Sequence, residues 1–236
     1  MKRNKELRAD ARLALKDHWG WAILVCIIFC SICGVLAIPN VISQFSSQAM
    51  RSGNFFSPAL AATAIGTTLV TSSISLAFGL FGRNPLSVGL FNSFNRYFSN
   101  SDYNTVGNLF RLGFGGGHYW RNVLGIFLMN LFVFLWTLLF IIPGIIKAYA
   151  YAMTPYILVD NPELGPNEAR LKSIEMMRGH KWKLFGLQLS FIGWFLLCLL
   201  SLGVGFIWLM PYVRTTYAAF YRNLKEEFDP QPAIAE

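Results

Sequence analysis

The chain has 236 residues, of which 54% are hydrophobic and only 14% are charged, and its formal net charge is +8. Soluble domains carry about 25% charged residues, so this deficit excludes an ordinary soluble domain. The basic residues lie in short segments between apolar stretches, which favours membrane topology over nucleic-acid binding as the reason for the charge. We therefore expect one integral membrane domain over residues 1–228 and a disordered tail over 229–236.

The first polar segment predicts an amphipathic surface helix over residues 1–18. Leu7, Ala11, Ala14 and Leu15 fall on one face of this helix, and basic side chains surround them. The pattern is typical of a helix on an anionic membrane surface, or of a helix docked against the protein's own loops. The next apolar stretch is as long as a full span, which favours a signal anchor over a cleaved signal peptide.

Six apolar stretches predict three helical hairpin units, each with a cytoplasmic amphipathic helix. The units cover 19–100, 101–165 and 166–228. Their predicted spans are 19–38 with 59–81, 122–142 with 144–159, and 184–202 with 206–221. The chain is thus predicted to be an all-α, polytopic membrane protein with about six transmembrane helices. The stretches 144–159 and 206–221 are short enough to end within the bilayer, so four to six spans are compatible with the sequence.

Turn residues mark the predicted reversals of the second and third hairpins. Pro143-Gly144 interrupts an apolar run that is too long for one crossing, and Leu202 to Gly205 separates the last two spans. Gly165-Pro166 predicts the start of a surface helix, with Glu168 in its first turn.

The placement of Lys and Arg predicts that both termini are cytoplasmic. Of the 20 basic residues, 17 lie in the segments 2–16, 83–121, 170–183 and 222–225. Six spans place all four segments on the cytoplasmic side, as the positive-inside rule requires, and leave Arg51 outside.

Similar short strings indicate an internal repeat, although general membrane composition is an alternative explanation. Three strings precede spans: His18-Trp19, His118-Tyr119-Trp120 and His180-Lys181-Trp182. Three Pro-led strings accompany the returning helices: NPLSVGLF from Asn84, TPYILV from Thr154 and MPYVRTTY from Met210. Repeat interfaces often hold the binding sites of membrane proteins.

The sequence predicts neither catalysis nor a cofactor or metal. Cys26, Cys30 and Cys33 share one helix face without His or acid, which favours packing over metal or redox chemistry. The predicted spans contain no acid, which argues against a carboxylate proton relay. We find no HExxH, GxSxG or Walker sequence.

Two basic residues within predicted spans, together with a nearby tyrosine, are the candidate anion or lipid contacts. Arg214 lies near mid-span, where a charge costs at least about 2.5 kcal/mol. A lipid phosphate or an anionic substrate could pair with Arg214, beside Tyr217. Lys147 lies close to a span end, and the alternative for both cations is that they extend to the nearer interface.

The stretch from Phe140 to Leu197, followed by LGVGFIWLMPYVRTTYAAFY, closely resembles a bacterial integral-membrane family known only as domain of unknown function nine-seven-five. The resemblance covers nearly the whole chain. The matching residues are Pro143, Gly144, Lys147, Tyr149, Pro155, Tyr156, Asn161, Pro162, Glu168, Ala169, Ser173, Met177, Gly179, Trp182, Phe191, Trp194, Pro211 and Tyr217. It implies a multi-pass protein of the bacterial inner (plasma) membrane and brings no activity.

Three functions stay open at this point. The first is a non-enzymatic membrane component that contacts anionic lipids or organises protein partners, including further copies of itself, and binds no nucleic acid. The second is a transporter for an anionic or amphiphilic small molecule with Arg214 at its site. The third is an enzyme acting on lipid phosphates. It would need an acid or metal cluster, for which Asp160, Glu163 and Glu168 are the local candidates, although loop and helix-cap roles explain these acids better.

Overall fold

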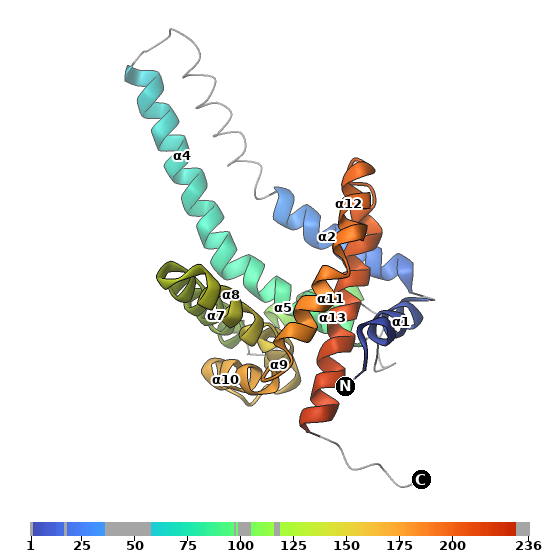
Figure 1. Cartoon of the computed structure of the whole chain (residues 1–236). Helices are drawn as coiled ribbons and strands as arrows, with labels where there is room; N and C mark the ends of the chain where they lie inside the picture. Colours follow the sequence, from blue (N-terminus) through green and yellow to red (C-terminus); the bar gives the residue numbers. More distant parts are fainter. Residues whose placement is uncertain are drawn as a thin grey trace.

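A computed structural model describes residues 2–16, 18–35, 58–96, 98, 105–115 and 119–229. Arg51, His118 and the predicted disorder of 230–236 lie outside these ranges. The regular elements in the described ranges are all helices (Figure 1). They are α1 (Asn4–Leu15), α2 (Trp19–Val35), α4 (Pro58–Phe78), the π-helix η1 (Gly79–Arg83), α5 (Asn84–Arg96), α6 (Thr105–Phe114), α7 (Tyr119–Leu139), α8 (Ile141–Tyr151), α9 (Thr154–Asp160), α10 (Pro166–Met176), α11 (Lys181–Leu189), α12 (Ile192–Leu200) and α13 (Phe206–Phe228).

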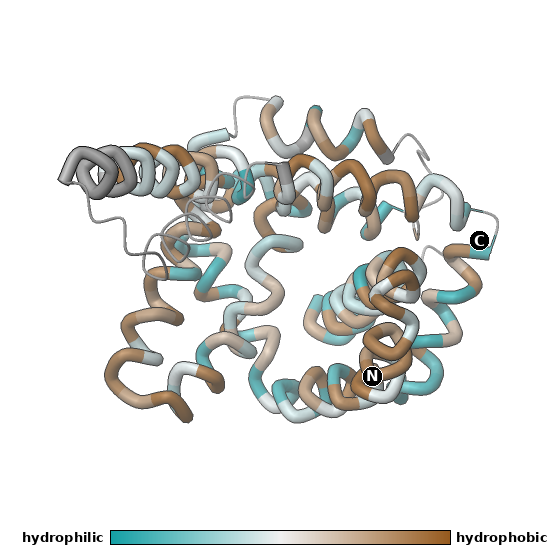
Figure 2. The backbone as a smooth tube through the Cα atoms, turned by 90° about the horizontal axis from the view of Figure 1, so that it is seen from above, coloured by the Kyte–Doolittle hydropathy of each residue, from teal (hydrophilic) through white to brown (hydrophobic). Residues whose placement is uncertain are grey.

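Three stretches of the described chain are long and apolar enough to cross a membrane. They are Gly66–Arg96, Tyr119–Leu139 and Lys181–Leu200, and α1 with α2, bent by 96°, forms a fourth candidate. The all-α prediction is confirmed, and helices that can span a membrane indicate a membrane location. The predicted fourth and sixth spans are not among these candidates. The fourth is divided into α8 and α9, of 11 and 7 residues, and α13 is amphipathic rather than uniformly apolar. Along the backbone, long apolar stretches alternate with shorter hydrophilic ones (Figure 2).

Helix α13 connects the N-terminal, middle and C-terminal helices of the fold. It contacts α1, α2, α5, α10 and α12 (Figure 1). On the apolar face of α1, Leu7, Ala11 and Leu15 are fully buried in the core, and Ala14 is partly buried against it. Burying a leucine side chain stabilises a fold by about 1.5–3 kcal/mol. The apolar face of α1 is therefore docked on the protein itself, against α13 and α11 rather than against loops.

The second hairpin is formed by α7 and the pair α8–α9, which runs back along it. A Cβ atom on Gly144, early in α8, would lie 2.6 Å from the Cα of Thr137, late in α7. A Cβ on Gly125, early in α7, would lie 2.5 Å from Leu158 of α9. The turn itself is at Phe140, whose backbone is extended (φ −154°, ψ 135°), three residues before the predicted turn at Pro143-Gly144.

The third hairpin and α10 follow the sequence-based expectations closely. Leu202 (φ 53°) and Gly203 (φ 89°) both adopt left-handed backbone at the predicted reversal between α12 and α13. Gly165 precedes α10, Pro166 is its first residue, and the Gly165 N–H donates to Glu168 Oε2 over 2.8 Å. This hydrogen bond satisfies a backbone donor at the helix N-terminus.

The three Pro-led strings of the predicted repeat come together in the core. α5 begins at Asn84 and α9 at Thr154, whereas the third string lies within α13. The ring of Phe91 in the first string lies 5.0 Å from the ring of Tyr156 in the second, and the guanidinium carbon of Arg214 in the third lies 5.0 Å from the Phe91 ring centre. These contacts join all three predicted units into one core. They do not test the division into units, which stays a prediction.

Candidate functional site

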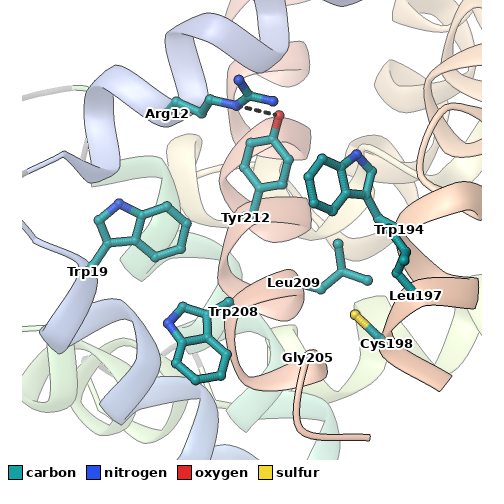
Figure 3. Close-up of a pocket in the computed structure, with 9 residues that line it drawn as sticks. All are labelled: Arg12, Trp19, Trp194, Leu197, Cys198, Gly205, Trp208, Leu209 and Tyr212. Carbon is teal, nitrogen blue, oxygen red and sulfur yellow. Dashed lines mark hydrogen bonds between the residues drawn. The ribbon is translucent and has the colours of Figure 1, made fainter. Parts of the chain in front are cut away.

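An apolar pocket of about 460 Å³ lies along α12 and α13, with α1 and α2 at one end (Figure 3). We call it the Arg12 pocket. It is lined by Arg12, Trp19, Trp194, Leu197, Cys198, Gly205, Trp208, Leu209 and Tyr212.

The docking of α1 on α13 places Arg12 at one end of this pocket. Its Nε donates a hydrogen bond to the hydroxyl oxygen of Tyr212 over 3.2 Å, and its guanidinium carbon lies 5.5 Å from the centre of the Tyr212 ring. Tyr212 is itself buried and packs edge-on against Phe191, with ring centroids 5.5 Å apart. Figure 3 shows the guanidinium above the tyrosine hydroxyl and Gly205 at the opposite end. The orientation of Arg12 is thus set by a buried aromatic side chain.

Arg12 differs from the two basic residues before α1 in lacking an acidic partner. Lys2 pairs with Asp10 and Arg3 with Glu6, each over 2.8 Å, but no carboxylate of the described residues contacts Arg12. Its side chain is exposed, and only one of its five N–H groups is engaged by Tyr212. The remaining donors form a fork that suits a phosphate or carboxylate.

Three tryptophans form the walls of the pocket. Trp194 is 47% exposed and Trp208 is 53% exposed, and Trp19 lies beside the α1–α2 junction. Tryptophan at such positions is typical of the membrane–water interface, where an apolar ring system meets polar head groups. At the far end, a Cβ on Gly205 would lie 2.7 Å from the sulfur of Cys198, so α12 and α13 close the pocket there.

This arrangement combines a cation at one end with aromatic and aliphatic walls along the remainder. Binding sites for small amphiphiles are mostly apolar with a few placed polar groups. An oxyanion head group on Arg12 and an apolar chain along Trp208 and Leu209 would satisfy both parts. The geometry contains no nucleophile–base pair, and within the described part of the chain no three His, Cys, Asp or Glu residues are grouped to hold a metal.

The residues predicted as anion contacts lie elsewhere: Arg214 and Tyr217 are one turn apart on α13, and Lys147 is on α8. The Arg214 guanidinium lies 5.0 Å from the Phe91 ring centre on α5, and the Lys147 ammonium lies 4.8 Å from the Trp136 ring centre on α7. Both cations therefore contact an aromatic ring, an attractive interaction that offsets part of the cost of a charge in an apolar region. Tyr217, one turn after Arg214, forms a hydrogen bond with the side chain of Gln188. The Gln188 side chain also accepts a hydrogen bond from the Tyr149 hydroxyl.

Sequence reasoning did not identify Arg12 or the two later tryptophans as a site. Arg12 is one of six basic residues on the first segment, and its partner Tyr212 lies 200 residues later in the chain. The only hint in the sequence was that tryptophans occur both at Trp19 and on either side of the predicted reversal at Leu202–Gly205.

Two of the three acids considered for an enzyme, Asp160 and Glu168, have structural partners. Asp160 accepts hydrogen bonds from Lys225 Nζ over 2.8 Å, from the Tyr221 hydroxyl over 3.1 Å and from Asn95 over 3.2 Å. Glu168 caps α10. Glu168 therefore has the helix-cap role expected from the sequence, whereas Asp160 joins α9 to α13 and α5.

The sequence model of a family described as "Protein of unknown function (DUF975)" matches residues 110–227. The matched region includes α12 and α13, which form the long walls of the Arg12 pocket, and begins after Arg12 and Trp19. No curated protein and no solved structure matches the chain.

Proposed function

The chain belongs to the family of proteins of unknown function DUF975, and from that premise we propose that it is a non-enzymatic membrane protein that binds anionic lipid in the Arg12 pocket. The observation that carries the proposal is the position of Arg12. Its guanidinium is held by Tyr212 at the end of a tryptophan-lined pocket, and no described carboxylate neutralises it.

Charge and apolar surface support the same ligand class. The first 16 residues carry six basic side chains against two acids, and each basic residue near an anionic surface adds about 1 kcal/mol of attraction. Attraction of this kind concentrates anionic lipids near α1. The Arg12 pocket then offers one of them a specific position, with its phosphate on Arg12 and an acyl chain beside Trp208.

Native mass spectrometry in a neutral maltoside detergent tests the proposal. Wild type, Arg12→Gln and Lys5→Gln are compared for retention of phosphatidylglycerol and of zwitterionic phosphatidylcholine. Lys5 is the matched control, because it is exposed on the same helix and does not line the pocket. A charge-assisted hydrogen bond contributes about 1.5–3 kcal/mol, so Arg12→Gln should weaken phosphatidylglycerol binding roughly tenfold. Equal effects of the two substitutions, or none, would refute the specific site.

We further propose six crossings of the bacterial inner membrane with both termini cytoplasmic. The positive-inside distribution supports this topology, as do the antiparallel packing of α8–α9 along α7 and the tight α12–α13 reversal. Single cysteines in a cysteine-free chain test it. A membrane-impermeant maleimide should label Ser201→Cys in intact cells and Glu163→Cys only after permeabilisation. Labelling of Glu163→Cys in intact cells would contradict six spans.

A further inference from the structure

A second cavity, of about 710 Å³, lies beside the π-helix η1. Its walls come from positions 75–91 of α4, η1 and α5 and from 126–134 of α7, with Ala152 and Pro155 at the break between α8 and α9. We call it the η1 cavity. It shares no lining residue with the Arg12 pocket, and its volume is within the range of small-molecule sites.

The π-helix is anchored by the first residues of α7. The hydroxyl of Tyr119 donates a hydrogen bond to the backbone carbonyl oxygen of Phe81 in η1 over 2.6 Å, and Trp120 packs edge-on against the Phe81 ring. A π-helical turn widens the helix and leaves carbonyl groups without their usual partners, and such turns are frequent at functional sites. The hydrogen bond from Tyr119 therefore stabilises the irregular segment that forms one wall of the cavity.

Arg83, the last residue of η1, places a positive charge on the cavity wall. It lies within the candidate span Gly66–Arg96, is exposed, and has no carboxylate partner among the described residues. In the proposed six-span topology Arg83 begins the cytoplasmic basic segment 83–121, so it lies at the level of the lipid head groups. Asn84 and Asn130 add amide groups to the same cavity. These groups can donate hydrogen bonds to an oxyanion.

The remaining wall is apolar, with Leu76, Phe127 and Phe134 among its residues. Both long walls belong to candidate membrane spans, so a ligand with an apolar chain can reach the cavity from the lipid phase. We propose that the η1 cavity binds one anionic amphiphile, with its phosphate or carboxylate on Arg83 and its chain along Leu76 and Phe134. This site is separate from the lipid contact at Arg12.

Binding of dodecyl phosphate by the full chain in neutral maltoside micelles tests the proposal. All variants are made in an Arg12→Gln background, so that the first pocket does not contribute and the two proposals can fail independently. Arg83→Gln should weaken binding about tenfold, because it removes the charged donor. Arg111→Gln should leave binding unchanged, because Arg111 is exposed on α6 and does not line the η1 cavity.

A second variant tests the cavity rather than the charge. Gly79 lines the η1 cavity, and a Cβ added there meets no atom within 4 Å, so the backbone admits a side chain at this position and Gly79→Leu reduces the cavity while keeping Arg83. It should abolish dodecyl phosphate binding without lowering the unfolding temperature. Unchanged binding in both Arg83→Gln and Gly79→Leu, or equal loss in Arg111→Gln, would overturn the site. Binding of inorganic phosphate as tight as that of dodecyl phosphate would overturn its assignment to an amphiphile.

Discussion

Gly144 lies directly against Thr137, so that the start of α8 and the end of α7 touch backbone to backbone. A Cβ on Gly144 would be 2.2 Å from the Thr137 hydroxyl oxygen and 2.6 Å from its Cα. The glycine therefore permits the close approach of two antiparallel helices. It does not form the turn between them, which Phe140 makes with extended backbone.

Gly144→Ala should destabilise the protein, because the added methyl group overlaps backbone atoms that cannot move away. Overpacking of this kind costs about 1–3 kcal/mol. The unfolding temperature in detergent measures the effect. Gly193→Ala on α12 is the matched control, since a Cβ there meets no atom within 4 Å and alanine favours a helix. Equal unfolding temperatures for the two variants would show that the α7–α8 contact is absent.

The Asp160 carboxylate joins α9 to α13 and α5 through three donors. We expect Asp160→Ala to lower the free energy of unfolding by about 2–3 kcal/mol, because it leaves Tyr221 and Asn95 without an acceptor. Lys225→Gln should cost only about 0.2–1 kcal/mol, because Lys225 is 41% exposed and its ion pair is screened by solvent. Unfolding in mixed SDS micelles measures both. If Asp160→Ala lowered the free energy of unfolding no more than Lys225→Gln does, this role of Asp160 would be contradicted.

Arg121 at the start of α7 binds the end of α9 through backbone carbonyl groups. Its guanidinium donates to the carbonyl oxygens of Leu158 over 2.7 Å and Asn161 over 3.0 Å, and also to that of Pro162. Lysine keeps the charge but lacks the planar fork. Arg121→Lys and Arg121→Gln should therefore both destabilise the fold, by about 1–3 kcal/mol. Full stability of Arg121→Lys in thermal unfolding would show that charge alone suffices.

Acid should weaken the N-terminal turn of α1. The carboxylate of Glu6 accepts a hydrogen bond from the Arg3 backbone N–H over 2.9 Å and another from the Arg3 side chain over 2.8 Å. These hydrogen bonds hold the pKa of Glu6 below its ordinary value of 4.5. Because the folded pKa is the lower one, the stabilisation is present above about pH 4.5 and is lost as the pH falls through the folded pKa. Hydrogen exchange of α1 amides, corrected for intrinsic rates, should show this loss in the wild type and not in Glu6→Gln. The same pH profile in both proteins would contradict it.

The sequence allowed the helices to be predicted, because each long apolar run between polar segments has the length of a helix. The reversal at Leu202–Gly205 was predictable because glycine tolerates left-handed backbone. The break between α8 and α9 was missed, although Pro155, near the start of α9, favours a helix start at that point. The turn at Phe140 was not predicted, because a phenylalanine with extended backbone has no distinctive sequence signal.

The Arg12 pocket could not be predicted in the same way, because its parts meet only through tertiary packing. Leu7 and Leu15 identified the apolar face of α1, but nothing local identifies α13 as the surface that this face covers. Once α1 is docked, Arg12 must meet Tyr212. The predicted site residue Arg214, two positions further along α13, meets Phe91 instead.

Photo-crosslinking with a diazirine-bearing phosphatidylglycerol tests the central claim most directly. Wild type, Arg12→Gln and Lys5→Gln are reconstituted into phosphatidylcholine vesicles that contain the probe, irradiated and digested, and the labelled peptides are identified by mass spectrometry. The Arg12 pocket predicts that labelling is concentrated on residues 194–212 of α12 and α13, and that it falls severalfold in Arg12→Gln but not in Lys5→Gln. Labelling spread evenly over all apolar helices, and equal in the three proteins, would contradict a specific anionic-lipid site.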